Sequence, residues 1–268
     1  MSNLVRRVLS AVVALPLLVA LILWAPRWAF AGLVVVCSAL GSRELTAMLM
    51  PDAGRGQRTL LGVITVALTV ALILRPDAAL GWILAGLISA ATVVLLAPGP
   101  LPGAGPRLGA AALGILYVGA LTAPLALLHR QLAAGPLWVL TALAATFAND
   151  SGAYFAGRAL GRHKLYPLIS PAKTIEGGAG GLALAVAVLF VVRATFFPAL
   201  TVVDCLLLAV PASILGPIGD LVESMLKRSA GVKDSGNLIP GHGGILDRLD
   251  ALLFVGAWVY AYALYLRP

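Results

Sequence analysis

The sequence has 268 residues, of which 60% are apolar and 11% are charged, and its mean hydropathy is +0.99. This composition, with apolar runs of about twenty residues, is typical of polytopic membrane proteins and excludes an ordinary soluble domain. A net charge of +8 also fits nucleic-acid binding, but the distribution of the basic residues favours membrane topology and phosphate binding, so no nucleic-acid partner is expected.

Apolar runs long enough to cross a bilayer succeed one another along the chain, and turn or charge signals separate them. The first follows Arg6 and Arg7. A cleaved signal peptide is the alternative there, but Arg27 interrupts the run and many spans follow. The pattern predicts an all-α, polytopic membrane protein with about nine spans, the seventh and eighth forming a hairpin. The predicted spans are 8–25, 28–50, 59–75, 79–97, 108–128, 136–156, 177–197, 199–219 and 250–266.

The basic residues predict the orientation of these spans. If the N-terminus is cytoplasmic, only five of the 19 lysines and arginines fall outside, which leaves 14 inside. The positive-inside rule then favours a cytoplasmic N-terminus and an extracytoplasmic C-terminus, in the inner (plasma) membrane. Loops 157–176 and 220–248 then lie together on the cytoplasmic face. The five outside residues are Arg27, Arg75, Arg130, Arg193 and Arg267.

Polar residues divide the chain into two parts. The early spans carry few polar groups, which predicts a transmembrane scaffold over 1–130. The later spans and loops hold most of the charged residues, which predicts a catalytic transmembrane domain over 131–268. Cys37 and Cys205 sit in apolar surroundings and indicate neither a disulfide framework nor a metal cluster.

Charge is densest from Ser224 to Asp250, and ionisable residues beside a membrane are usually functional. The segment 219–228 overlaps the start of this stretch. If it is a helix, its polar residues share one face. An amphipathic helix lying on the membrane surface is the alternative, but such a helix has no need of an acid at the end of an apolar span. The residues of this face are Asp220, Glu223, Ser224, Lys227 and Arg228.

The glycines after Pro240 cannot form a stable helix interior, and they let backbone approach a ligand closely. Asp247 and Asp250 follow one turn apart at the start of the last span. Capping of that helix explains Asp250 equally well. For Asp247 we favour a metal, because hard oxygen ligands beside lysine and arginine indicate Mg²⁺ with phosphates. His242 has no second histidine or cysteine at ligand spacing and is expected to bind phosphate or orient a carboxylate.

A third polar region combines Asp150, at the end of an apolar run, with 170–178. Ser170, Lys173 and Thr174 supply hydrogen-bond donors there. Capping of the following helix explains much of this pattern alone. Together with the other two regions it predicts a third wall of one cytoplasmic pocket.

The stretch from Ser224 to Asp250 as a whole resembles the signature of the phosphatidate cytidylyltransferases, or CDP-diacylglycerol synthases. Asp150 to Tyr154 and Ser170 to Gly178 are also similar to the family, with Ser151 where threonine is common and Ala172 where lysine is common. The resemblance is strong in the C-terminal half and rests on hydropathy alone in the N-terminal half. Its elements are Ser224, Lys227-Arg228, Lys233-Asp234, His242-Gly243-Gly244, Asp247-Arg248 and Asp250.

This resemblance implies transfer of CMP from CTP to phosphatidic acid, giving CDP-diacylglycerol and pyrophosphate, in a multi-pass membrane enzyme of phospholipid biosynthesis. Mg²⁺ would bind Asp220 and Asp247, and K⁺ is a candidate for a second cation. A homodimer is a candidate for the oligomeric state. A CTP-dependent polyprenol kinase and a transporter are the alternatives. The expected catalytic residues are Asp220, Lys227, Arg228, Asp247 and Arg248, and the expected substrate-binding residues are Asp150, Ser170, Lys173, Thr174, Ser224, Lys233, Asp234, His242, Gly243 and Gly244.

Overall fold

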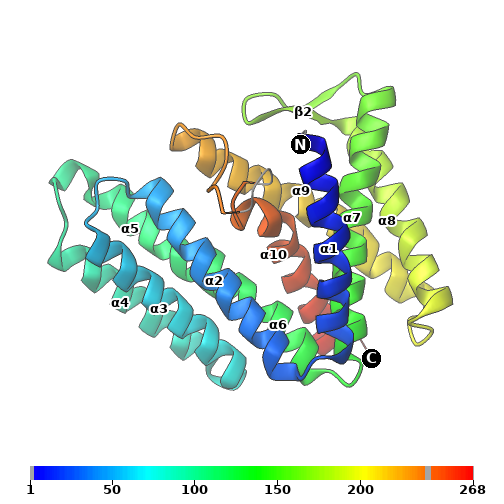
Figure 1. Ribbon diagram of the computed structural model, residues 1–268, viewed down its shortest axis with the longest axis horizontal. Coiled ribbons are helices and arrows are strands. Elements are labelled where there is room, and N and C mark those ends of the chain that lie inside the picture. Colours follow the sequence, from blue (N-terminus) through cyan, green and yellow to red (C-terminus); the bar gives the residue numbers. More distant parts are fainter. Residues whose placement is uncertain (1–2, 239–242, 268) are drawn as a thin grey trace.

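The computed structural model describes residues 3–238 and 243–267, and helices make up most of them. Figure 1 shows these helices side by side in a bundle, with a small β-hairpin at one end. The described start and end of the chain lie at opposite ends of the bundle (Figure 1). The elements are α1 (Asn3–Trp24), α2 (Arg27–Leu49), α3 (Arg55–Leu74), η1 (Pro76–Ala78), α4 (Ala79–Leu96), η2 (Leu101–Gly103), α5 (Ala104–Leu113), η3 (Gly114–Ala120), α6 (Leu121–Gln131), α7 (Gly135–Leu160), β1 (Lys164–Tyr166), β2 (Ser170–Thr174), α8 (Ile175–Thr195), α9 (Val202–Ser229), α10 (Leu246–Ala261) and η4 (Tyr262–Leu266).

Seven helical segments within the described residues are long and apolar enough to cross a membrane. They include α2, α3, α8 and α9, and the all-α polytopic prediction is confirmed. In α1 the apolar part, Ala14–Trp24, is shorter, and α7 carries Asn149 and Asp150 within its length. The count of nine spans therefore stays a prediction.

The helix that contains the first charged face is longer than the sequence predicts. The apolar run was expected to end at residue 219, whereas α9 continues without a break to Ser229. Pro211 and Pro217 lie inside it and do not end it. The polar face of 220–228 is thus the last part of this long helix, and these residues do not form the separate surface helix that was the alternative.

The loop predicted over 157–176 contains a short β-hairpin, which the all-α prediction does not include. β1 and β2 pair antiparallel, with Lys164 opposite Thr174 and Tyr166 opposite Ser170. The hydroxyl of Thr174 accepts the N–H of Gly177 at 3.1 Å, which caps α8 directly after the hairpin. The hairpin is therefore fixed to the helix that follows it.

Small residues bring the helices of the C-terminal half close together. A Cβ on Gly152 of α7 would lie 2.5 Å from the carbonyl oxygen of Gly180 in α8. A Cβ on Gly219 of α9 would lie 2.3 Å from the carbonyl oxygen of Asp250 in α10. Close backbone contact through glycine is the usual way in which membrane helices pack. It places the polar ends of α7, α9 and α10 next to one another.

Arginines assigned to the outer face bind carbonyl oxygens between helices. Arg27 donates to the carbonyl of Arg130 at 3.1 Å, and Arg130 donates to that of Ile73 at 3.0 Å. Arg193 donates to the carbonyl of Leu200 at 2.9 Å. The carbonyls of Ile73 and Arg130 lie in the last turn of their helices, and that of Leu200 lies in the loop before α9, so these contacts satisfy groups that would otherwise need water.

Candidate active site

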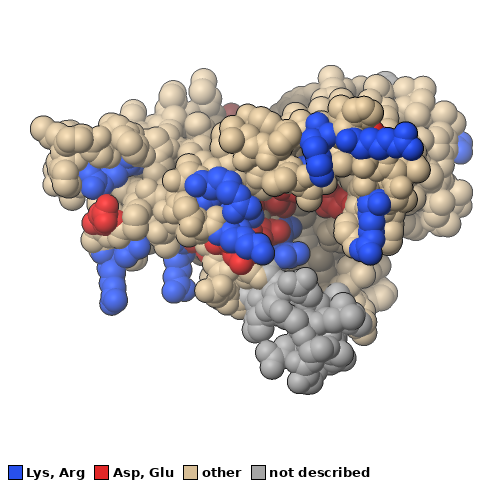
Figure 2. Space-filling model, turned by 90° about the horizontal axis from the view of Figure 1, so that it is seen from above, with Lys and Arg blue, Asp and Glu red and all other residues tan. Residues whose placement is uncertain are grey.

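The predicted site residues that the structure describes gather where the end of α9, the start of α10 and the β-hairpin meet. Figure 2 looks onto this end of the bundle and shows lysine and arginine side chains with acidic side chains between them. Both polar loops, 157–176 and 220–248, reach this end (Figure 1). The described parts of the three polar regions found in the sequence thus lie on one end of the molecule.

Lys173 of β2 forms an ion pair with Asp220 of α9, with Nζ 2.8 Å from Oδ2. The ammonium also lies 3.4 Å from the carbonyl oxygen of Pro217, and the hydroxyl of Ser224 donates to the other oxygen of Asp220 at 3.2 Å. The side chains of Lys173 and Asp220 are 23% and 38% exposed. The pair therefore joins the hairpin to α9 and stays accessible to a ligand.

Asp150 of α7 and Asp250 of α10 are acidic neighbours of Asp220. Asp220 acts electrostatically on both, Asp150 acts on Asp250, and Lys173 offsets part of the charge at Asp150. The glycine at position 219, where α9 meets the backbone of Asp250, permits this approach. Asp220 therefore lies amid negative charge, which the ammonium of Lys173 partly offsets.

A second lysine, Lys227, lies between two carboxylates further along α9. Its Nζ is 2.5 Å from Oδ1 of Asp247 and in direct contact with Glu223. Glu223 is completely buried and Lys227 is 9% exposed. Because both carboxyl groups are shielded from water, the ammonium of Lys227 is the main charged partner of each. We call Glu223, Lys227 and Asp247 the buried cluster.

Asp247 also holds the segment that precedes α10. Its Oδ2 accepts the N–H of Ser235 at 2.9 Å and that of Gly244 at 2.8 Å. Gly243 has φ +79°, a conformation that other residues rarely adopt, and a Cβ there would lie 2.7 Å from the same oxygen. The close approach that the sequence predicts at these glycines thus has a carboxylate of the protein itself as its partner.

Glu44 of α2 binds the same segment from the N-terminal half. Its Oε1 accepts the N–H of Ile245 at 3.0 Å and its Oε2 accepts that of Leu246 at 3.0 Å. The hydroxyl of Ser235 lies 3.1 Å from Oε2. Leu246 begins α10, so a buried carboxylate caps this helix where its dipole favours negative charge. This contact crosses the predicted boundary at residue 130.

The remaining basic residues of the signature lie on the outer side of this segment. Arg228 donates to the carbonyl of Val232 at 3.1 Å. Lys233, Asp234 and Arg248 are exposed at the same end. The position of Lys233 and Arg248 suits contact with an anionic ligand, whereas Asp234 carries a negative charge, and the roles predicted for all three stay predictions.

Ser170 and Thr174 belong to β2. Ser170 is half-buried opposite Tyr166, and the buried hydroxyl of Thr174 is engaged in capping α8. Their predicted contacts with substrate stay predictions. His242 lies outside the described residues, together with the role predicted for it.

The sequence matches a known family. The model of the cytidylyltransferase family matches residues 5–266. The chain belongs to the cytidylyltransferase family. It is similar to proteins named phosphatidate cytidylyltransferase from Bacillus subtilis (46% identical over 126 residues, 47% of each chain), Staphylococcus saprophyticus (45% over 130 residues, 48% of this chain and 49% of the relative) and Staphylococcus haemolyticus (49% over 118 residues, 44% and 45%). These alignments span about half the length of each relative.

Asp220 and Asp247, the two predicted metal ligands, differ in their surroundings. Within the described residues, no group of three or more His, Cys, Asp or Glu side chains is arranged to hold a metal ion. Asp247 already accepts Lys227 and the loop N–H groups, whereas Asp220 is more exposed and has two acidic neighbours. The chemistry of the donors, all hard carboxylate oxygens, fits Mg²⁺ at Asp220 more readily than at Asp247.

Three buried residues near the site were not among the predicted site residues. Glu44 and Glu223 are acids within apolar helices, and that signal led to Asp150 and Asp220 but was not followed for these two. Tyr117 lies in the π-helical segment η3 and interacts electrostatically with acids of the site. Its buried hydroxyl has no hydrogen-bond partner among the described residues. Nothing in the hydropathy of the segment marks this tyrosine.

Proposed function

We propose that this protein transfers CMP from CTP to phosphatidic acid, giving CDP-diacylglycerol and pyrophosphate, at the cytoplasmic face of the plasma membrane. The observation that carries the proposal is the similarity, at 45–49% identity, to proteins named phosphatidate cytidylyltransferase. The Lys173–Asp220 pair and the exposed basic residues at the end of a membrane-spanning bundle support it, because both substrates are polyanions and one is a lipid.

The reaction needs little from a general base. An oxygen of the phosphatidate phosphate, already anionic at neutral pH, attacks the α-phosphorus of CTP. The bond from that phosphorus to the bridging oxygen breaks, and pyrophosphate leaves with the electron pair. The barrier arises mainly from repulsion between two anions, so positioning and positive charge supply the catalysis.

The residues of the chain divide this work. Lys173 can exchange its contact with Asp220 for a phosphate of CTP, since both side chains are accessible. Arg228, Lys233 and Arg248 are exposed nearby and can bind the remaining phosphate oxygens, the arginines in bidentate fashion. The buried cluster, by contrast, keeps the segment before α10 in place.

We propose Mg²⁺ as the cofactor, with Asp220 as its principal ligand and Asp150 and Asp250 as neighbours. Binding at Asp247, as the sequence pattern suggests, requires Lys227 to release an oxygen. When bound, the ion would neutralise charge on the triphosphate and on the departing pyrophosphate. K⁺ as a second cation and a homodimer belong to the same proposal.

Turnover assays test the function. The purified protein is given phosphatidic acid and each of the four nucleoside triphosphates, with Mg²⁺ and with EDTA. We expect labelled cytidine in the lipid product with CTP and Mg²⁺ only. A phosphorylated polyprenol without cytidine would instead indicate a CTP-dependent kinase, and full turnover in EDTA would remove the metal from the proposal.

Reporter fusions test the orientation. A reporter after Pro268 should read out as extracytoplasmic, and a tag within 161–166 should read out as cytoplasmic. Both on the same side would contradict a cytoplasmic site combined with nine spans.

A further inference from the structure

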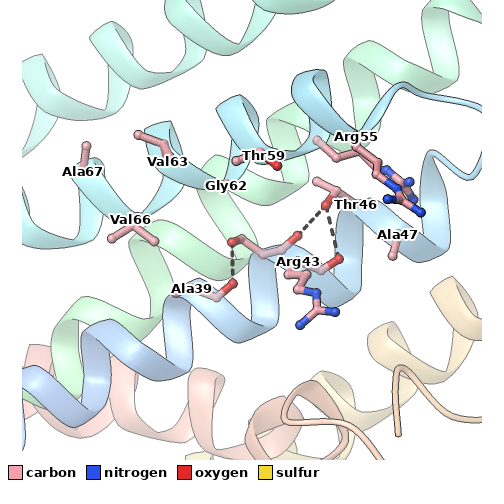
Figure 3. Close-up of a pocket in the computed structure, with 12 residues that line it drawn as sticks. Ala39, Arg43, Thr46, Ala47, Arg55, Thr59, Gly62, Val63, Val66 and Ala67 are labelled. Carbon is pink, nitrogen blue, oxygen red and sulfur yellow. Dashed lines mark hydrogen bonds between the residues drawn. The ribbon is translucent and has the colours of Figure 1, made fainter. Parts of the chain in front are cut away.

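A groove between α2 and α3 lies outside the candidate active site. Its volume is about 710 Å³, and all its lining residues belong to these two helices. Figure 3 shows Arg43 and Arg55 towards one end of the groove and Val63, Val66 and Ala67 towards the other. The groove therefore has a basic end and an apolar length. The connection between α2 and α3 lies at the same end of the bundle as the β-hairpin (Figure 1).

The basic end holds three arginines, Arg43, Arg55 and Arg58. None of the three guanidinium groups forms an ion pair or hydrogen bond with another described residue. Arg55 and Arg58 lie in the first turn of α3, and Gly54 before them offers no side-chain cap. Uncapped N–H groups and the positive end of the helix dipole add to the attraction for an anion.

The apolar part runs away from the arginines along α3. Val63, Val66 and Ala67 follow Arg58, and at 1.5 Å per residue the wall from Arg58 to Ala67 is about 14 Å long. Val63 is 58% exposed on a helix long and apolar enough to span the membrane, and an exposed valine on such a helix is expected to contact acyl chains. A polar anionic head and an apolar tail are the two parts that such a groove accommodates.

We propose that this groove binds an anionic glycerophospholipid of the surrounding leaflet, with its phosphodiester on the three arginines and an acyl chain along the valines. A soluble nucleotide has no counterpart for the apolar wall. A second copy of the same face would bring arginines against arginines. None of the predicted site residues lines the groove, so the occupant is a bilayer lipid and not the reacting molecule.

The groove adjoins the segment that carries the signature. Arg43 directly precedes Glu44, whose carboxylate binds the backbone at the start of α10. A lipid phosphate on Arg43 therefore fixes the same turn of α2 that caps this helix. The inference does not rest on the proposed reaction, and its test measures binding alone.

Native mass spectrometry of the detergent-purified full chain tests it, with phosphatidylglycerol, phosphatidic acid and phosphatidylcholine of identical acyl chains. The wild type should prefer phosphatidylglycerol. The triple variant Arg43→Gln/Arg55→Gln/Arg58→Gln should bind it at least about tenfold more weakly, since several charge-assisted contacts are lost. Equal binding of the two lipids by the wild type would overturn the proposal.

The matched control is Arg158→Gln/Arg162→Gln/Lys164→Gln, which removes the same charge from exposed residues of the hairpin region. It should retain the preference, and an equal loss in this control would mean non-specific attraction. If the first triple variant fails to fold, Val66→Trp fills the apolar part with the arginines intact. Undiminished binding by Val66→Trp, or binding of phosphatidic acid alone among anionic lipids, would also contradict a bilayer phosphodiester lipid in the groove.

Discussion

Two lysine–carboxylate clusters involve the same helix, α9, and they differ in exposure and in the number of partners. Lys173 and Asp220 are partly exposed and each has few other contacts. In the buried cluster, Lys227 contacts two carboxylates, and Asp247 accepts two further backbone N–H groups. The same residue types can thus form an exchangeable site, in which a ligand replaces a protein contact, or a fixed frame, in which the contacts hold the backbone in place. Burial decides which.

Lys227→Ala should have the largest effect on folding. It leaves Glu223 and Asp247 shielded and without their cation, and removal of one partner from a buried ionic cluster costs about 3–5 kcal/mol. Thermal unfolding in detergent should show a large fall in midpoint for this variant. Lys173→Ala serves as the control, because a partly exposed pair contributes about 1 kcal/mol or less. Equal unfolding midpoints for the two lysine variants would contradict the inference that the buried cluster contributes more to stability than the Lys173–Asp220 pair.

Asp220→Asn should abolish most activity and leave folding intact. It removes the carboxylate that pairs with Lys173 and that we assign to the metal, so the rate should fall at least about a hundredfold. Asp77→Asn is the control, an exposed acid paired with Arg75. Steady-state kinetics and unfolding midpoints should separate the two acids. A wild-type rate for Asp220→Asn would move the metal elsewhere.

Asp247→Asn should lose activity to a similar extent, at least about a hundredfold, but with a lower unfolding midpoint as well. The amide cannot replace the carboxylate beside Lys227 and the two loop N–H groups. Measuring rate and midpoint together distinguishes a ligand from a frame residue. An unchanged midpoint would place Asp247 with Asp220 in the exchangeable site.

Hydropathy predicted where most of the helices lie, but it missed the end of α9 and the β-hairpin. The end of α9 was expected at residue 219 because the charged face begins there, yet the apolar face of 221–226 continues the same helix. The hairpin was missed because two strands of three and five residues, with Pro167 between them and Pro171 inside the second, carry no alternating pattern. The short strands and their prolines, and not the composition of the loop, are the reason that the hairpin was not predicted.

The candidate site was predictable where ionisable residues cluster along the sequence. Lys173 and Asp220 were placed in one pocket from separate regions, and the structure puts them in contact. Glu44 was not found, because the first 130 residues were interpreted as scaffold and one acid in that half carries no motif. Its partners are backbone N–H groups, which every sequence position offers alike. Only the fold reveals such a contact.

Lys173→Ala should affect CTP use and little else. Loss of one charge-assisted hydrogen bond corresponds to roughly a tenfold to more than a hundredfold fall in kcat/KM for CTP, with membrane insertion unchanged. Near-normal kinetics of both Lys173→Arg and Lys173→Gln would mean that this lysine anchors the hairpin at the membrane edge and binds no nucleotide.

Glu44→Gln should have the smallest effect, and it tests whether the frame around the buried cluster extends into the N-terminal half. The amide offers one acceptor oxygen where the carboxylate serves two backbone N–H groups, and its NH₂ would face one of them. Loss of this cap should cost about 0.5–2 kcal/mol, so amide exchange at 244–248 should accelerate while exchange in α3 stays unchanged. Asp52→Asn, at an exposed acid just beyond α2, is the control and should alter neither. If Glu44→Gln leaves exchange at 244–248 at the wild-type rate, Asp247 alone holds the segment and the frame ends within the C-terminal half.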